Sequence, residues 1–289
     1  MEIIYDNSQL QEFKNCQYRY WLHYGLGYKK RQEGVDEHDK NFGTAIHAGL
    51  ETHYKGGDLG SVIKAFSEAY PTQLSTDDNA KTQENGIKIL QEYIKHYQEQ
   101  DKKFKVLACE ETDTFEIAPG VNYRVKIDLI VENTEQGGVY VIDHKTTGKS
   151  FDYRYWSQFE PNSQLTGYSA YAQKRFKEAH GAMINGIRLG YRQRKYLDSP
   201  AGFYYEFQRQ LFNRSKNQIE AWKRDVLHWV ALLTLARENN RWGKNMSQCT
   251  YCSYRPICLA EWDPLTESDR DCIEIQYDKV DPYEYLKKT

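Results

Sequence analysis

The chain has 289 residues, which is long enough for one large domain or two and for a substantial buried core. Its formal net charge of −2 excludes a protein that is basic all over, so any positive potential for nucleic acid must be gathered in a cleft. The sequence has no apolar run of transmembrane length and no basic-then-apolar leader at its start. We therefore expect a soluble, cytoplasmic protein without membrane contact.

The N-terminal third of the chain predicts helices, at about residues 8–23, 42–54, 59–70 and 78–100. Ser8 can cap the first helix, which contains Cys16. In the second helix, Gly43 and His47 lie four positions apart and share a face. His47 could point toward the hairpin that follows, although a lone histidine is more often structural.

From residue 104 the period changes, and strands are predicted at residues 105–109, 114–117, 123–132 and 139–145. A turn at Gly137 and Gly138 joins the last two strands into a hairpin. Asp143 and Lys145 project from one face of the second strand, about 6–7 Å apart. Pairing could bring Asp128 alongside them. Two carboxylates and a lysine suit divalent-metal hydrolysis, because the carboxylates hold a hard cation while the lysine steadies or activates water.

Two neighbouring acidic residues, Glu110 and Glu111, lie between the first two predicted strands. Either residue could join the metal site, but a solvated turn is the stronger expectation.

After the hairpin, a helix is predicted from residue 161 or 162 to about residue 177. Gln164 and Tyr168 occupy i and i+4 positions on its face, where they could hold a nucleotide, orient the lysine or simply pack. Strands at residues 184–193 and 203–210 and a long helix at residues 215–238 follow. Candidates for a DNA track are Arg154, Tyr155, Trp156 and the basic turn at residues 192–195.

The six cysteines do not form a pattern typical of a disulfide scaffold. Three of them, Cys249, Cys252 and Cys258, have the spacing C-x2-C-x5-C, which predicts a metal or cluster site. Cys16 is the natural fourth ligand. This split pattern favours iron–sulfur, because zinc sites usually use two compact pairs, but both accept four thiolates. The acidic tail, residues 263–289, is expected to be partly disordered, which leaves residues 1–262 as one domain.

Together these motifs resemble the RecB-like branch of the PD-(D/E)XK nuclease superfamily. They are most similar to its iron–sulfur exonucleases, which include CRISPR-associated adaptation nucleases and AddB-type nuclease domains. The match runs in order from Cys16 to Cys258, through G-x-x-x-H, I-D, D-x-K, Q-x-x-x-Y and the cysteine box. Two positions depart from the family pattern. Val125 stands where a glycine is often found, and Asp143 replaces glutamate, which is an accepted variant.

The resemblance implies an α/β, restriction-endonuclease-like fold, with a mixed central sheet flanked by helices and a helical cap closed by a four-cysteine cluster. It implies that His47, Asp128 and Asp143 bind Mg²⁺ or Mn²⁺, together with the backbone carbonyl of His144. It implies that Lys145 positions the water and stabilises the developing charge.

By the same resemblance, Gln164 and Tyr168 support the lysine or contact the DNA. The residues implied to hold a structural [4Fe–4S] cluster are Cys16, Cys249, Cys252 and Cys258.

The function that these features favour is a metal-dependent DNA nuclease, an exonuclease acting on single strands or ends. Repair, recombination, CRISPR adaptation and phage DNA processing all suit it, with helicase, recombination or CRISPR proteins as partners in a bacterial or phage-infected cell. The alternatives are a non-catalytic DNA-binding subunit of a nuclease or helicase complex, and a zinc-stapled enzyme of the same fold. The complete ligand set argues against the non-catalytic alternative, and the oligomeric state stays open.

Overall fold

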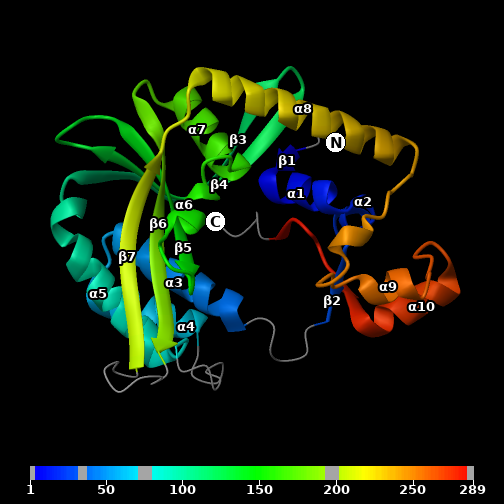
Figure 1. Ribbon diagram of the computed structural model, residues 1–289, viewed down its shortest axis with the longest axis horizontal. Coiled ribbons are helices and arrows are strands. Elements are labelled where there is room, and N and C mark those ends of the chain that lie inside the picture. Colours follow the sequence, from blue (N-terminus) through cyan, green and yellow to red (C-terminus); the bar gives the residue numbers. More distant parts are fainter. Residues whose placement is uncertain (1–3, 32–37, 71–79, 193–201, 285–289) are drawn as a thin grey trace. The chain divides into compact units, whose positions relative to one another are not determined.

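The computed structural model describes residues 4–31, 38–70, 80–192 and 202–284 (Figure 1). The chain folds as two compact units. Unit 1 comprises Met1–Glu33, Thr112–Val125 and Glu220–Thr289, and unit 2 comprises Gly34–Glu111 and Lys126–Ile219. Each unit is therefore assembled from segments that are far apart in the sequence.

The helices are α1 (Asn7–Asn15), α2 (Gln17–Tyr20), α3 (His38–Tyr54), α4 (Leu59–Ala69), α5 (Gln83–Asp101), α6 (Tyr153–Ser157), α7 (Ser163–Arg175), α8 (Lys216–Glu238), α9 (Arg255–Leu259) and α10 (Glu267–Gln276). A π-helical turn (Trp21–Gly25) and a 3₁₀ turn (Met246–Gln248) add to them. Among the described residues, no helix is both long and apolar enough to span a membrane.

The strands are β1 (Ile4–Asp6), β2 (Tyr28–Lys30), β3 (Phe104–Ala118), β4 (Val121–Asn133), β5 (Val139–Thr147), β6 (Ala179–Arg192), β7 (Gly202–Phe212) and β8 (Tyr277–Lys279). Six of them form a sheet in the order β1-β4-β5-β6-β7, with β3 also paired to β4. The β1/β4 and β5/β6 pairs are parallel, whereas β4/β5 and β6/β7 are antiparallel. A central mixed sheet flanked by helices is the expected α/β architecture, which is confirmed.

In unit 2, helices α3 and α5 pack on the sheet, and α4 packs on these two helices in the same buried core. Leu129, Ile142 and Ile187 point from three neighbouring strands into this helical layer and are fully buried there.

The turn between β4 and β5 lies at the two glycines where the sequence predicts it. Gly137 and Gly138 both have positive φ (+74° and +90°), which glycine adopts without steric cost. The turn thereby fixes the register that runs from Glu132↔Val139 to Leu129↔Ile142.

Unit 1 has its own smaller core, built from buried side chains of its N-terminal and C-terminal segments: Trp21, Leu22, Tyr28, Tyr254, Ile257, Ile273 and Tyr277. Strand β8 pairs with β2, so the segment after residue 262 contributes a helix and a strand to this unit. The Tyr254 hydroxyl donates to the Tyr28 carbonyl at 2.5 Å and ties the two ends further.

The first predicted helix is wrong at Cys16, where the backbone is extended (φ −164°, ψ 115°) and separates α1 from α2. The amide of Cys16 still donates to the Glu12 carbonyl, so the last turn of α1 is closed by a backbone hydrogen bond. This break lets the Cys16 side chain leave the helix surface.

Candidate active site

The candidate active site lies where strands β4 and β5 stop pairing. The ladder ends at Leu129 and Ile142. Beyond this pair, the backbone N–H of His144 on β5 donates to Oδ2 of Asp128 on β4 at 2.8 Å. A side-chain carboxylate therefore takes the place of a main-chain acceptor. The Asp128 side chain is only 12% exposed. Where the hairpin opens, the Asp128 carboxylate therefore lies between the two strands, largely shielded from solvent.

Two further ligand groups converge on this carboxylate. Nδ1 of His47, from α3, lies 3.5 Å from Oδ2 of Asp128. Glu110, from β3, completes a group in which one ligand atom of each residue lies within 4.8 Å of the others. Two carboxylates and one imidazole are a donor set that suits Mg²⁺ or Mn²⁺. The residues present therefore fit the metal that the sequence motifs imply.

Glu110 was expected in a solvated turn, and this expectation is wrong. A single strand, β3, runs through the position, and the Glu110 side chain is only 19% exposed. Its φ of +48° is rare for a residue other than glycine and costs of order 1–3 kcal/mol. Such strain is typical of functional sites, and here it accompanies a contact of 3.0 Å between Oε2 of Glu110 and Nζ of Lys126.

Asp143 and Lys145 share a face of β5, as predicted, and form an ion pair at 2.7 Å. The Asp143 side chain is 3% exposed, whereas that of Lys145 is 37% exposed. Burial lowers the pKa of Lys145, but the Asp143 carboxylate outweighs this effect and the pKa is raised. Lys145 is therefore a protonated cation that a solvent-borne substrate can reach.

Burial raises the pKa of Asp128 to about 6. The His47 ring lowers this pKa, whereas Asp143 and Glu110 raise it further. Asp143 thus acts electrostatically on the metal-ligand group, although its own carboxylate lies outside the three-residue set. Three carboxylates crowded together with little solvent favour the binding of a cation.

Gln164 and Tyr168 lie on α7, which Asn162 caps by accepting from the amide of Leu165. Nε2 of Gln164 donates to the Tyr168 hydroxyl at 2.8 Å, and this hydroxyl donates to the Lys126 carbonyl at 2.6 Å. The second hydrogen bond fastens α7 to β4 two residues before Asp128, and the first holds the Tyr168 hydroxyl in place for it. The pair therefore supports the strand that carries a metal ligand.

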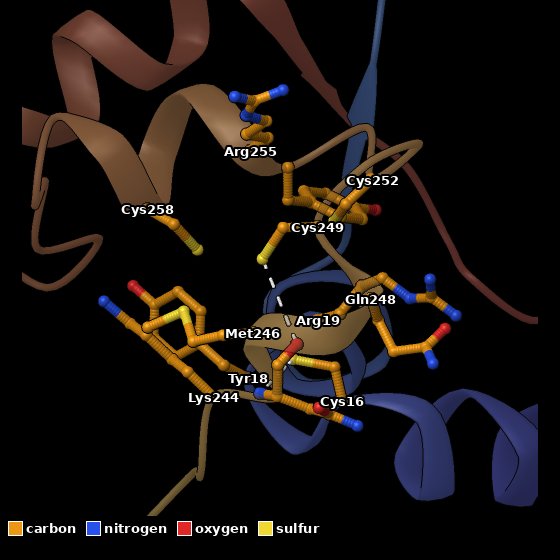
Figure 2. A pocket seen from close by; sticks show the side chains of 12 residues that line it. Cys16, Tyr18, Arg19, Lys244, Met246, Gln248, Cys249, Cys252, Arg255 and Cys258 are labelled. Carbon is orange, nitrogen blue, oxygen red and sulfur yellow. Dashed lines mark hydrogen bonds between the residues drawn. The ribbon is translucent and has the colours of Figure 1, made fainter.

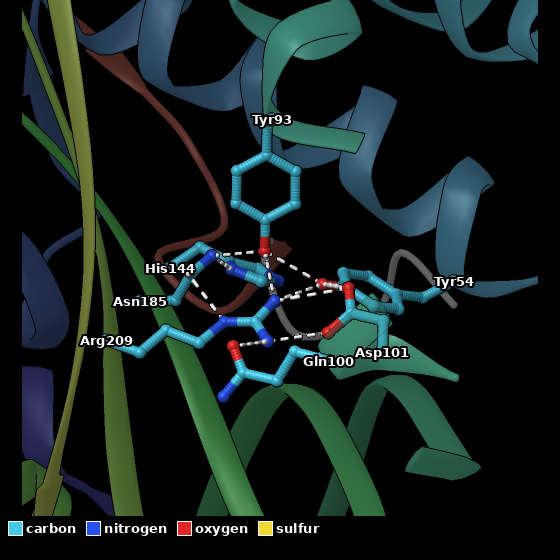
Figure 3. Close-up of polar contacts among 7 residues, drawn as sticks. All are labelled: Tyr54, Tyr93, Gln100, Asp101, His144, Asn185 and Arg209. Atoms are coloured by element: carbon cyan, nitrogen blue, oxygen red, sulfur yellow. Dashed lines mark hydrogen bonds and ion pairs between the residues drawn. The ribbon is translucent and has the colours of Figure 1, made fainter. Parts of the chain in front are cut away.

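A buried network on the opposite face of β5 holds His144 (Figure 3). Nε of Arg209 donates to Oδ1 of Asn185 at 3.4 Å, so the amide nitrogen of Asn185 faces Nδ1 of His144 at 2.6 Å. Nδ1 must then accept, and the ring carries its proton on Nε2. Burial, followed by His47 and Arg209, holds the pKa of His144 well below its usual range. His144 is therefore a fixed, neutral imidazole behind the metal-ligand group.

Two of the residues expected in a DNA track are not available to bases. Tyr155 and Trp156 of α6 are 5% and 7% exposed and pack among Phe151, Phe159 and Phe212. Both belong to the core. Arg154 and Arg192 are exposed, and residues 193–195 of the basic turn lie outside the described residues.

In unit 1, Cys16, Cys249, Cys252 and Cys258 line one pocket (Figure 2). The amide of Asn245 donates to Sγ of Cys16 at 3.4 Å. The same pocket is lined by Arg19, Lys244 and Arg255, and its described lining includes no carboxylate. The donors and the charge therefore suit a negatively charged, sulfur-ligated group.

A closed four-cysteine site is nevertheless not confirmed. Within the described part of the chain, the His47, Glu110 and Asp128 group is the one that brings three ligand atoms within 4.8 Å of one another, and no three cysteine sulfurs lie that close together. Burial raises the pKa of Cys252 and Cys258, so without a bound group both remain thiols.

Comparison with known proteins identifies the family. A family model described as the PD-(D/E)XK nuclease superfamily matches residues 7–259. The chain therefore belongs to the PD-(D/E)XK nuclease superfamily. No curated protein matches it.

Among solved structures, 27 chains match. One, titled "Crystal structure of SSO0001", is 15% identical and aligns with 89% of this chain and 95% of its own, at a TM-score of 0.30. A TM-score this low supports no argument about the site.

Proposed function

We propose that the protein is a Mg²⁺- or Mn²⁺-dependent deoxyribonuclease that removes nucleotides from single strands or ends. The observation that carries the proposal is the convergence of His47, Glu110 and Asp128 within 4.8 Å, in a chain of the PD-(D/E)XK superfamily. The Asp143–Lys145 pair at 2.7 Å is the second support. A non-catalytic relative would be expected to have lost one of these groups.

The proposed metal ligands are His47, Glu110 and Asp128, with Asp143 and the carbonyl of His144 beside them. A divalent cation held there would polarise the scissile phosphate and lower the pKa of a bound water. Lys145 would place its ammonium against the phosphate oxygen on which charge develops. Gln164 and Tyr168 would keep β4 in position through the Lys126 carbonyl, and Arg209 would keep His144 in position from behind.

For unit 1, we propose a [4Fe–4S] cluster with a structural role, as in the RecB-like iron–sulfur branch. Four cysteines line one pocket with cationic neighbours, which supports a thiolate-ligated group. A tetrahedral zinc ion held by the same four thiolates is the alternative for this pocket.

The test of the nuclease proposal is cleavage of end-labelled single- and double-stranded DNA with Mg²⁺ or Mn²⁺, with Lys145→Ala and Asp143→Ala run in parallel. We expect cleavage by the wild type and a loss of at least about 10²-fold in each variant. A product ladder from one end would establish exonuclease polarity. A wild type that binds DNA but cleaves nothing would support the non-catalytic subunit, and activity that survives both substitutions would contradict the proposed site.

A further inference from the structure

One face of the β6/β7 strand pair continues the face of β5 that carries Lys145, and its side chains range from half-buried (Phe151, Arg188, Tyr204) to exposed (Arg192, Glu206). In the β5/β6 register, Lys145 pairs with Gly186 and Thr147 pairs with Arg188. Side chains of directly paired residues point to the same face of a sheet. The alternate residues of β6 that follow Gly186 therefore extend outward from the candidate active site.

Along this face, aromatic rings and arginines alternate. A Cβ on Gly186 would lie 2.8 Å from Cζ of Phe151, so the Phe151 ring lies directly on the strand. Arg188 follows, and a Cβ on Gly190 would lie 2.6 Å from Cζ of Tyr204. The two glycines are required because any other side chain would displace a ring.

Arginines flank the second ring. Cζ of Arg188 lies 5.1 Å and Cζ of Arg192 lies 5.5 Å from the centroid of the Tyr204 ring. Successive positions on one face of a strand are about 6.6 Å apart, so the row from Gly186 to Arg192 is about 20 Å long. We name Phe151, Arg188, Tyr204 and Arg192 the hairpin ladder.

We propose that the hairpin ladder binds a single DNA strand and leads it to Lys145, an inference that rests on the proposed nuclease function. Rings accept stacked bases of any sequence, and arginines neutralise the phosphates between them. A duplex keeps its bases stacked inside and cannot use the rings in this way. The ladder therefore selects single strands.

In the protein without DNA, one arginine of the hairpin ladder is paired with an acidic side chain. Glu206 forms an ion pair of 2.9 Å with Arg188, and its side chain is 47% exposed. An incoming phosphate must compete with this carboxylate for the guanidinium. Removal of the charge on Glu206 is therefore expected to strengthen DNA binding, which a purely structural role of these residues does not predict.

The experiment measures binding of fluorescein-labelled oligo(dT) by anisotropy in EDTA, over a range of salt concentrations. We expect Tyr204→Leu to weaken binding about 5- to 150-fold, the effect of one lost stacking contact, and Tyr204→Phe to bind as the wild type does. Arg192→Ala should lower the slope of log K against log[salt] by about 0.7. Glu206→Gln should bind more tightly, a gain that misfolding cannot produce. Lys64→Ala, which removes an exposed lysine of α4, is the charge-matched control and should bind as the wild type does.

Three outcomes would overturn the ladder: unchanged binding by Tyr204→Leu, weaker binding by Glu206→Gln, or a labelled hairpin duplex that binds as tightly as oligo(dT). Hydrolysis of thymidine 5′-p-nitrophenyl phosphate by the wild type tests the metal site separately. If the protein binds oligo(dT) through the ladder but hydrolyses neither DNA nor the small substrate, the ladder proposal stands and the nuclease proposal is wrong. If the protein hydrolyses the small substrate but every variant binds oligo(dT) as the wild type does, the nuclease proposal stands and the ladder proposal is wrong.

Discussion

At the scale of single residues, the site depends on one buried carboxylate, Asp128. It lies between β4 and β5, accepts from the amide of His144, and has a pKa raised by burial to about 6. The metal-free protein therefore carries a costly negative charge near neutral pH. A bound cation relieves this cost, which couples metal binding to stability.

Asp128→Asn should stabilise the metal-free protein at about pH 8 by about 1–3 kcal/mol, because it keeps an acceptor for His144 and removes the buried charge. Since the folded pKa lies above the unfolded value, stability from protonated Asp128 is fully present below about pH 4 and is lost as pH rises through about 6. Thermal unfolding in EDTA across this range should show the loss in the wild type and not in the variant. An equally large loss in the variant would assign it to another group.

The same carboxylate predicts how metal affinity depends on pH. A proton on Asp128 competes with the cation, so the affinity for Mn²⁺ should fall below about pH 6, approaching tenfold per pH unit where one proton is displaced. Calorimetric titrations between about pH 5 and about pH 7.5 would measure this dependence. An affinity that is constant over the range would exclude Asp128 as a ligand.

At the scale of structural elements, Arg209 joins β7 to two helices and to β5. Its guanidinium donates to Asp101 on α5 at 2.5 Å, and to the hydroxyls of Tyr54 on α3 and Tyr93 on α5 at 2.8 and 2.9 Å (Figure 3). Asn185 continues the network to His144. The side chain of Arg209 is 5% exposed, so its charge is balanced by the Asp101 carboxylate, while the two neutral phenols accept hydrogen bonds from it.

Arg209→Met should destabilise the protein by about 3–5 kcal/mol, because it leaves the largely enclosed Asp101 carboxylate without its cationic partner. Adding Asp101→Asn should recover part of the loss, because the pair then carries no uncompensated charge. Urea unfolding of the two single variants and the double variant gives the coupling energy. Strictly additive effects would contradict a direct pair.

The hairpin was predictable because its signals are local. The turn glycines and the alternation of Val139, Val141 and Asp143 determine the register within a few residues. The network of Arg209 was not predictable, since its partners lie about one hundred positions away and nothing near the arginine indicates them.

Glu110 was assigned to a turn because it interrupts the strand pattern in the sequence. In the structure β3 is continuous there and has a positive φ at this one residue. Tyr155 and Trp156 were misassigned because an aromatic cluster has the same composition whether it is buried or exposed.

At the scale of the whole molecule, the metal-ligand group lies in unit 2 and the cysteine-lined pocket lies in unit 1. The cysteine pocket of unit 1 gathers its residues from positions 16 and 249–258, and α10 and β8 complete the same unit. The order of the sequence motifs indicated the superfamily that the family match shows. The composition gave no sign that part of the acidic segment forms α10 and β8.

If the pocket holds the proposed cluster, Cys249→Ser should abolish metal binding and lower the melting temperature of unit 1, because structural metal sites contribute their binding free energy to folding. Cys272→Ser is the matched control, since Cys272 is half-buried on α10 and does not line the pocket. Iron and zinc analysis with visible absorption would check both variants. Bound iron with visible absorption would support the cluster, and bound zinc without visible absorption would support the zinc-stapled alternative. An equal loss of metal and of melting temperature in both variants would contradict a role for this pocket.

The most direct test of the account is the Mn²⁺ dependence of single-turnover cleavage of end-labelled single-stranded DNA by the wild type, Glu110→Gln and Glu111→Gln. The two glutamates are adjacent, but Glu110 belongs to the metal-ligand group whereas Glu111 pairs with Arg175. We predict Mn²⁺-dependent cleavage by the wild type, a half-activating Mn²⁺ concentration at least about tenfold higher in Glu110→Gln, and an unchanged value in Glu111→Gln. Absence of cleavage at every Mn²⁺ concentration, or identical behaviour of the two variants, would contradict the proposed metal site.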